Sequence, residues 1–427
     1  MRKALILFVT VCLLGCSLFG CAVPPSQPDA ASDVTFLTAE VFSSDRVAGE
    51  VGADFRNAYA DFAIRLLKAS QDLKGRLVSP LSVMTALQMA ANGAKGETLR
   101  QFEKLLGGNM DVEALNRELF NYYRSLNDAA GKDAKFEAAN AVWMTNDENF
   151  KVAEEFVRVI SNTFDAQLAQ ASFTDPKTVD AINDWCRKHT DDMIPKILEY
   201  SDVGVDTTMV LLNAILFDAL WSSPYEEGQC RTEVFYTAEN GTVKDVTMMY
   251  CEGQRFIKGE HETGFFKYYQ GGYAFVALLP ESGMSLDSYL ATLDGTRFTG
   301  LMDGMQRRSV DTGLPKFSFD WSASLVETLK GMGLTDCFDP ARSDLSGLGT
   351  YDSYASFCIS DVIHKTHIEV DQSGTRAAAV TSVIVDRESS TKPEEKPKVI
   401  LNRPFVYAIV DTANMLPVFI GTVTNPA

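Results

Sequence analysis

The sequence predicts an α+β protein, because helical and strand patterns occupy different parts of the chain. Between about residues 38 and 127, apolar residues recur at helical spacing, as in FRNAYADFAIRLLKAS at 55–70. From Met209 onward, apolar runs of strand length predominate. One of these regions, EVFYTAENGTVKDVTMM at 233–249, carries Asn-Gly where a hairpin would turn. We therefore expect helices first and mostly antiparallel strands after them.

Three helical segments follow the first one along the chain. SPLSVMTALQMAANGAKGETLRQFEKLLG at 79–107 has Pro80 in a first helical turn and a stop at Asn92-Gly93. AEEFVRVISNTF at 153–164 predicts another helix, after a strand in FEAANAVWMTND at 136–147. The third, DPKTVDAINDWCRKHTDDMIPKIL at 175–198, is expected to be a helix that stops before Pro195.

The second half of the chain supplies most of the strands. MVLLNAILFDALW (209–221) and YAFVALLP (273–280) are almost wholly apolar, which predicts buried strands. ISDVIHKTHIEV (359–370) alternates, and VILNRPFVYAIVD (399–411) with MLPVFIGTVTN (415–425) close the chain. Between them, LPKFSFD (314–320) leads into a short helix in SASLVETLKGMG (322–333) that ends at glycine. Neither a repeat nor a linker divides the region after residue 38, so we expect one domain.

Charge and motif content exclude several function classes. A formal net charge of −18 offers no basic face for nucleic acid or phosphate. The sequence contains no GxSxG, HExxH, Walker or GxGxxG motif, so it predicts neither an enzyme nor a cofactor. His364 and His367 are three residues apart in a strand pattern and point to opposite faces, so no metal site is expected there. We expect His364 to be a buried, hydrogen-bonded histidine.

The first residues form a targeting segment. MRK supplies positive charge and ALILFVTVCLLGCSLFG is apolar, which is typical of a secretory signal over residues 1–20. The segment resembles a bacterial lipoprotein signal, in which a cysteine after the apolar run receives lipid. Cys21 is favoured over Cys16 because AVPPSQPDAASD follows it as a flexible tether, assigned to residues 21–45.

Five further cysteines predict buried free thiols rather than a disulfide framework. They are Cys186, Cys230, Cys251, Cys337 and Cys358. No pair forms CxxC, and an odd number leaves at least one thiol unpaired within the chain. A bridge between Cys230 and Cys251 is left open.

A segment near the C-terminus, GTRAAAVTSVIVDRESSTKPEEKPK at 374–398, combines two patterns. Its first half is uncharged at every second position, counted from Thr375 through Ala377, Ala379 and Thr381 to Val385. No proline interrupts it before residue 393, so every backbone amide there could join a sheet. From the residues alone, the first half is expected to be a sheet strand, with a disordered linker as the alternative, and the second half a solvated loop.

Several blocks of the sequence, in order, resemble the serpin family. They are SPLSVMTALQMAANGAKGETLRQ, LLNAILFDALWSSPYE, LPKFSFDWSASLVETLKGMGLTDCF, VIHKTHIEVDQSGTRAAA and VILNRPFVYAIVDTANMLPVFIGTVTNP. The resemblance implies one α+β domain over residues 46–427, with three β-sheets, a large mixed central sheet and about eight to nine helices. It also implies an exposed reactive-centre loop over about residues 372–400.

The family activity that this resemblance implies is suicide inhibition of a serine protease. The protease cuts the loop and becomes acylated, and the loop then enters the large sheet as a new strand and distorts the enzyme. The implied partner is a target protease in a covalent complex, with no nucleic acid, and with membrane contact only through the N-terminal lipid. The protein is expected to be a monomer. Two alternatives stay open: a non-inhibitory serpin that serves in surface binding or adhesion, and an inhibitor of a cysteine protease.

The resemblance also assigns roles to individual residues. The insertion hinge comprises Gly374, Thr375, Ala377, Ala378, Ala379 and Thr381. A polar cluster beneath the centre of the large sheet comprises Ser79, Ser82, Asn213 and His364. Trp221 stands at the top of the sheet, where insertion begins.

Two adjacent peptide bonds are candidates for the bond that a protease attacks. The usual spacing from the hinge places it at Glu388–Ser389, which implies an acid-preferring protease, and a loop one residue shorter gives Arg387–Glu388 and a trypsin-like one. Gln372 and Arg376 stand where serpins usually carry glutamate. Arg376 belongs to the outward-facing set, so the loop is still expected to be able to insert.

Overall fold

The protein is described from a computed structural model. The description covers residues 33–38, 48–70, 75–108, 110–130, 133–237, 241–351, 357–375 and 396–426. These residues belong to one compact unit that begins at Asp33. The expected signal segment and Cys21 lie outside the described residues.

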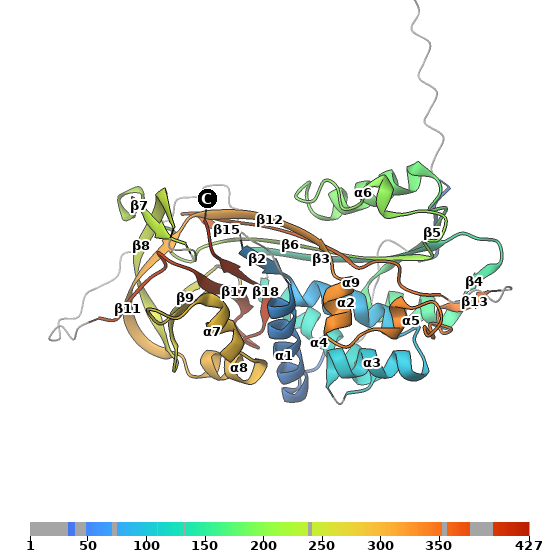
Figure 1. Ribbon diagram of the computed structural model, residues 1–427, viewed down its shortest axis with the longest axis horizontal. Helices are drawn as coiled ribbons and strands as arrows, with labels where there is room; N and C mark the ends of the chain where they lie inside the picture. The colour runs from blue at the N-terminus through green and yellow to red at the C-terminus, as the bar shows by residue number, and fades with distance from the viewer. Residues whose placement is uncertain are drawn as a thin grey trace, which may run out of the picture. The chain divides into compact units, whose positions relative to one another are not determined.

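The described residues contain nine α-helices and eighteen strands (Figure 1). The helices are α1 Ala53–Ala69, α2 Pro80–Ala91, α3 Gly96–Gly107, α4 Val112–Ala130, α5 Glu154–Phe164, α6 Pro176–His189, α7 Leu286–Thr292, α8 Gly295–Asp303 and α9 Val326–Gly331. The strands are β1 Thr35–Phe36, β2 Gly75–Val78, β3 Ala134–Thr145, β4 Phe150–Val152, β5 Gln167–Ala171, β6 Met209–Leu220, β7 Cys230–Tyr236, β8 Thr242–Lys258, β9 Glu262–Tyr268, β10 Tyr273–Pro280, β11 Gln306–Pro315, β12 Phe317–Ser324, β13 Gly349–Tyr351, β14 Ile363–Val370, β15 Gly374–Thr375, β16 Lys398–Ile400, β17 Phe405–Asp411 and β18 Pro417–Val423.

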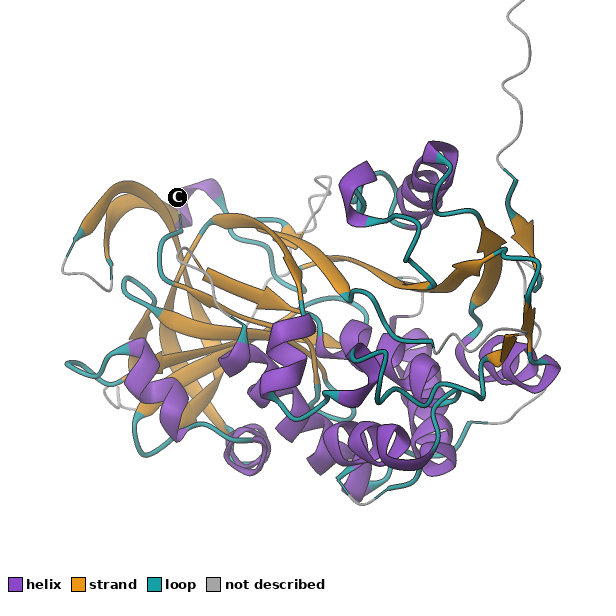
Figure 2. Ribbon diagram, turned by 45° about the vertical axis from the view of Figure 1, so that its right-hand side comes forward, coloured by secondary structure: helices purple, strands orange, loops and turns teal. Residues whose placement is uncertain are grey.

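The strands of the described region form three sheets, two of them large (Figure 2). The first has seven strands in the order β1-β5-β3-β6-β15-β14-β12. The second has nine in the order β16-β11-β8-β9-β10-β17-β18-β2, with β7 attached to β8, and the third pairs β13 with β4. Both large sheets are mixed, because β3–β5 and β11–β16 pair in parallel while the other pairs are antiparallel. The α+β class with several sheets is thus confirmed.

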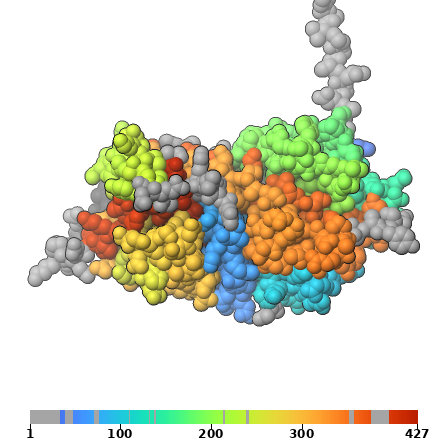
Figure 3. Space-filling model, viewed as in Figure 1, coloured from blue at the N-terminus to red at the C-terminus, as the bar shows by residue number. Residues whose placement is uncertain are grey.

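Helices lie on both faces of the seven-stranded sheet. Figure 1 shows α2 and α4 on one side of β3 and β6, and α6 on the other. The α2 helix is buried over its whole length, and the hydroxyl of Ser79 caps it by accepting from the amide of Ser82 at 3.2 Å. The space-filling view shows the green α6 region at the surface, next to residues coloured orange (Figure 3). The sheet therefore has one face against the main core and one partly covered face.

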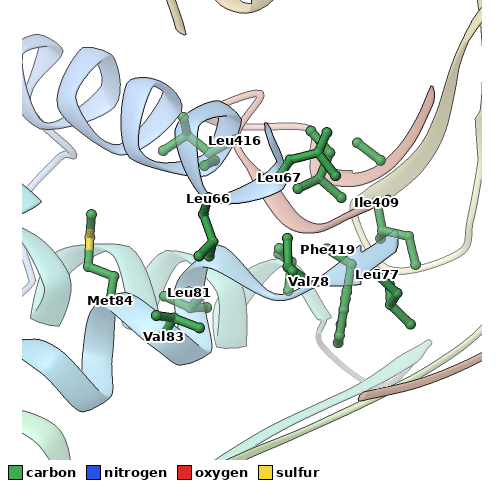
Figure 4. Close-up of a cluster of buried hydrophobic side chains, with 14 of the residues drawn as sticks. Leu66, Leu67, Leu77, Val78, Leu81, Val83, Met84, Ile409, Leu416 and Phe419 are labelled. Atoms are coloured by element: carbon green, nitrogen blue, oxygen red, sulfur yellow. The ribbon is translucent and has the colours of Figure 1, made fainter. Parts of the chain in front are cut away.

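The core joins the first helix to the second large sheet. Figure 4 shows Leu66 and Leu67 of α1 close to Leu77 and Val78 of β2. All four side chains are buried, as is Phe419 of β18 in the same close-up. Because β2 pairs with β18, this apolar cluster fixes α1 and the start of α2 against the sheet.

The hairpin at 233–249 is confirmed, and so is the stop of the helix before Pro195. Strands β7 and β8 pair as expected, and the amide of Thr237 donates to the carbonyl of Gly241 at 3.0 Å, although residues 238–240 are outside the description. The α6 helix ends at His189 and so stops before Pro195, as predicted. Asp191 and Asp192 take left-handed backbone angles, with φ of 47° and 62°, and these stop the helix before the proline is reached.

Two short helices, α7 and α8, were not predicted. Each begins at a capping side chain, Ser285 for α7 and Asp294 for α8. Their lengths of seven and nine residues are too short for a clear periodic signal. In the described part of the chain, no helix is long and apolar enough to cross a membrane.

Candidate functional site

The segment singled out near the C-terminus begins inside the seven-stranded sheet. Gly374 and Thr375 form β15, which lies between β6 and β14 and pairs antiparallel with both. Gly374 is opposite Leu220 and Thr375 is opposite Ala219. A Cβ on Gly374 would lie 2.2 Å from the carbonyl oxygen of Ala219, so this approach requires glycine.

Thr375 is buried, with 3% of its surface exposed. Its hydroxyl lies 2.5 Å from the hydroxyl of Tyr269, just after β9. The Tyr269 ring stacks on Trp221, with ring centroids 4.2 Å apart and an interplanar angle of 12°. Burial raises the pKa of Tyr269, so its hydroxyl stays protonated and can donate. Thr375 therefore faces inward with its polar group satisfied.

A tight turn connects β14 to β15. The Asp371 carboxylate accepts from the amides of Ser373 at 2.7 Å and Gly374 at 3.1 Å. The carbonyl of Asp371 accepts from the indole N–H of Trp221 at 2.8 Å, and the backbone amide of Trp221 donates to the carbonyl of Ser373 at 2.9 Å. Trp221, fully buried at the end of β6, thus holds the turn that precedes the hinge.

The strands β6 and β14 lie on either side of β15 in the sheet, and we call the boundary between them the seam. Among the described residues, backbone pairing across the seam occurs only at its two ends. Along the described backbone, the one direct bridge across this seam is the parallel one between Val210 of β6 and Asp361, which lies just before β14. At the opposite end the two residues of β15 separate them. A small cavity of about 10 Å³ lies next to Thr375, lined by Ile215 and Phe217 of β6 and by Ile368 of β14. A strand that continued from β15 would run along this seam.

The polar cluster predicted beneath the sheet forms around Ser79. The amide of Ser79 donates to Nε2 of His364 at 3.0 Å, and its hydroxyl donates to the carbonyl of Val418 at 2.9 Å. His364 is 4% exposed, and burial lowers the pKa of its ring to about 3, so the ring is neutral. This is the buried, hydrogen-bonded histidine that the strand alternation predicts.

The fourth member of that cluster, Asn213, is placed by its backbone only. It lies on β6, opposite Asn140 of β3. Asn140 is buried, and its side chain donates to the carbonyl of Phe164 at 2.8 Å, which ties β3 to the end of α5. The structure thus joins Ser79, Ser82 and His364, and it places the Asn213 backbone in the adjacent strand.

The rest of the segment lies outside the described residues. This holds for Ala377, Ala378, Ala379, Thr381, Arg387, Glu388 and Ser389, and for Arg376. The description resumes at Lys396, whose ammonium pairs with Glu252 at 2.6 Å. The following strand, β16, pairs in parallel with β11 in the nine-stranded sheet. The two ends of the segment are therefore held in different sheets.

Cysteines play no covalent part in this arrangement. All five cysteines in the described region, including Cys230 and Cys251, are free thiols. Burial raises the pKa of the Cys186 thiol to about 12, which makes it unreactive.

Sequence reasoning missed Tyr269 and Asp371, which hydrogen-bond directly to Thr375 and Gly374. Neither belongs to a motif, and Tyr269 is 106 residues from Thr375 in the chain. The one available signal was the position of Asp371 directly after a strand, where a carboxylate can accept from backbone amides of a turn.

Comparisons with known proteins agree with this architecture. The family model described as Serpin (serine protease inhibitor) matches residues 57–426. Iripin-5 of Ixodes ricinus is 30% identical over 386 residues, which cover 87% of this chain and 95% of Iripin-5.

Two solved structures of one protein are informative together. The thermophilic serpin Tengpin in its native state superposes with a TM-score of 0.84 at 37% identity, and covers 92% of this chain and 99% of that one. Its latent state gives a TM-score of 0.77 at 35% identity, with coverage of 89% and 100%. The structure is thus more similar to the native state than to the latent one. With a family match over most of its length and a seven-stranded sheet that is open between β6 and β14, this chain belongs to the serpin family.

Proposed function

We propose that this protein is a suicide inhibitor of a serine protease. The observation that carries the proposal is the position of β15, which starts a strand between β6 and β14 and goes no further in the described residues than Thr375. Beyond that point the two flanking strands lack direct pairing until Val210 and Asp361, so the seam offers backbone groups to an incoming strand. The greater similarity to native Tengpin than to latent Tengpin supports an uncut, mostly uninserted state.

Insertion of the remaining segment would release free energy. A strand of about ten residues gains on the order of ten backbone hydrogen bonds, at roughly 0.5–1.5 kcal/mol each. Burial of the small and β-branched side chains from Ala377 to Val385 adds to this. The sum is comparable to the whole stability of a domain, about 5–15 kcal/mol. The uncut protein is therefore a kinetic trap, released when a protease cuts the loop.

The identity of the target follows from the attacked bond. If the bond is Arg387–Glu388, the target is a trypsin-like protease, and if it is Glu388–Ser389, the target prefers acidic residues. The test is to incubate the full-length protein with a trypsin-like, an elastase-like and a glutamyl-specific serine protease, and separately with a cysteine protease. We expect a complex with one of the serine proteases that survives SDS and boiling.

Mass spectrometry of the released C-terminal peptide would identify the bond. A peptide that begins at Glu388 or at Ser389 decides the register. Cleavage by every protease without any stable complex would contradict inhibition and support a binding or adhesion role. A stable complex with the cysteine protease alone would reassign the target class.

We also propose that lipid on Cys21 tethers the protein outside a bacterial cell, where it would guard the surface against proteases. The motif after the signal segment supports this, with residues 21–45 as the tether. Expression in a bacterial host should place the wild-type protein in the membrane fraction. The Cys21→Ser variant should become soluble, and the Cys16→Ser variant should remain membrane-bound. The reverse pattern would assign the lipid to Cys16.

A further inference from the structure

A lysine with almost no solvent contact lies beneath the turn that leads into the hinge. Lys267 of β9 is 9% exposed, and in the described region it makes no ion pair with a carboxylate. Its ammonium donates to the carbonyl of Ser223 at 2.8 Å. It also lies 4.0 Å from the ring centroid of Tyr225 and 5.3 Å from that of Trp221. Two aromatic faces therefore supply most of its charge stabilisation.

The nearest sulfur belongs to Cys251. Its Sγ lies 3.8 Å from the Lys267 Nζ and 3.3 Å from the Thr312 hydroxyl. That hydroxyl donates to the Cys251 carbonyl at 2.9 Å, so its oxygen can accept from the thiol. Cys251 is partly exposed, whereas Lys267 is buried. The oxidation therefore requires an oxidant small enough to approach a partly exposed cysteine, and the amine lies on the buried side of the sulfur.

This pair is connected to the hinge through a few direct contacts. The amide of Tyr225 donates to the carbonyl of Gln372 at 2.9 Å, and Trp221 holds Asp371 and Ser373. The rings that receive the lysine cation thus belong to the residues that hold the turn before β15. A change in the charge of Lys267 would therefore alter the contacts that hold this turn.

We propose that Cys251 and Lys267 form a reversible covalent sulfenamide bond when a peroxide oxidises the thiol. This redox site is separate from protease inhibition and does not depend on it. It uses two side chains that the inhibitory mechanism leaves without a role.

The chemistry balances in two steps. The Cys251 thiol reduces the peroxide and becomes a sulfenic acid, with one water (from hydrogen peroxide) as the product. The neutral Lys267 amine then attacks the sulfur, a nitrogen–sulfur bond forms, and the hydroxyl leaves as water with a proton from the nitrogen. Burial lowers the pKa of Lys267, which increases the neutral fraction that this second step needs. Two equivalents of an external thiol reverse the bond and regenerate the amine and the Cys251 thiol.

The bond removes the cation from the faces of Trp221 and Tyr225. The indole environment therefore changes with the redox state of the pair, and so does the support of the hinge turn. A change in tryptophan emission that dithiothreitol reverses is the expected optical signature.

The test treats the full-length protein with hydrogen peroxide, blocks the remaining thiols and maps the peptides by mass spectrometry. We expect a peptide pair that joins Cys251 to Lys267, lighter by two hydrogen atoms than the sum of its parts, and absent after dithiothreitol. Trypsin should fail to cut after Lys267 in that pair.

Cys230 provides the matched control, because it is also partly exposed and also lies in the β7–β8 region. The Cys230→Ser variant should keep the cross-link, and Cys251→Ser should lose it together with the emission change. In Lys267→Met, a dimedone probe should label Cys251 instead, because the sulfenic acid has no amine to attack. A peroxide-dependent peptide pair that joins Cys251 to Cys230 in place of Lys267 would show a disulfide and overturn the proposal. Equal dimedone labelling of Cys251 in the wild type and in Lys267→Met would overturn it as well.

Discussion

The hydroxyl groups of Thr375 and Tyr269 lie 2.5 Å apart, and this contact joins the second of the two buried residues of β15 to the turn after β9. The same tyrosine ring stacks on Trp221, which holds the preceding turn. Gly374 and Thr375 are therefore already part of the seven-stranded sheet, between β6 and β14.

Removal of the Tyr269 hydroxyl should loosen the seated hinge. In Tyr269→Phe the buried Thr375 hydroxyl loses its partner, which costs about 1–3 kcal/mol of stability. The thermal unfolding midpoint of the uncut protein should fall. The double variant with Thr375→Val should lose less than the sum of the two single changes, because the same bond is removed twice. Strict additivity would show that the two hydroxyls do not interact.

Gly374 should not tolerate a side chain. A methyl group at Gly374 would lie 2.2 Å from the Ala219 oxygen, so Gly374→Ala should expel β15 or strain the sheet, at about 1–3 kcal/mol. Hydrogen exchange should become faster at Gly374 and Thr375. Gly331, in the exposed helix α9, is the control: a Cβ there meets nothing within 4 Å, so Gly331→Ala should be neutral or stabilising. Equal effects of the two changes would contradict the close approach at Gly374.

Acid should weaken the polar cluster at His364. Burial lowers the pKa of His364 from 6.5 to about 3, so the unfolded chain binds a proton that the folded protein does not. The stability that the neutral ring provides is fully present above pH 6.5 and is lost as the pH falls toward 3. The loss is about 1.4 kcal/mol for each pH unit in that window.

The measurement is chemical unfolding at a series of pH values below 6.5, with His364→Gln for comparison. Glutamine can still accept from the Ser79 amide but does not titrate, so the variant should show a shallower pH dependence by about one proton. An unchanged slope would mean that His364 is not the group that titrates on unfolding.

A charge at Thr375 should separate cleavage from inhibition. Because this side chain is buried in the seam, Thr375→Arg would place a cation in the core, and loop insertion would be strongly disfavoured. The protease should then cut the loop and be released, with little SDS-stable complex. Thr375→Ser, which keeps a hydroxyl for Tyr269, should retain complex formation. Survival of full inhibition in the arginine variant would contradict insertion at this position.

The sequence determined the fold class because its signals are periodic and local. Helical spacing predicted α1, alternation placed His364 on an inward face, and Asn-Gly predicted the hairpin of β7 and β8. The stop of α6 before Pro195 was predicted, but its exact end at His189 was not, because it depends on left-handed backbone angles at Asp191 and Asp192 that periodicity does not show. The blocks that resemble serpins also identified Ser79, His364 and Trp221, which the structure places around the two central strands.

The sequence by itself determined that the segment from Gly374 is uncharged at alternate positions and able to join a sheet. Only the tertiary structure decided that its first two residues already lie between β6 and β14, and that Tyr269, Asp371 and Lys267 surround the hinge. These partners come from strands and turns that are distant in the chain, and their contacts depend on how separate strands pack. The local sequence pattern predicts which residues of a strand share a face. Which residues from other strands contact that face is decided only when the sheet folds.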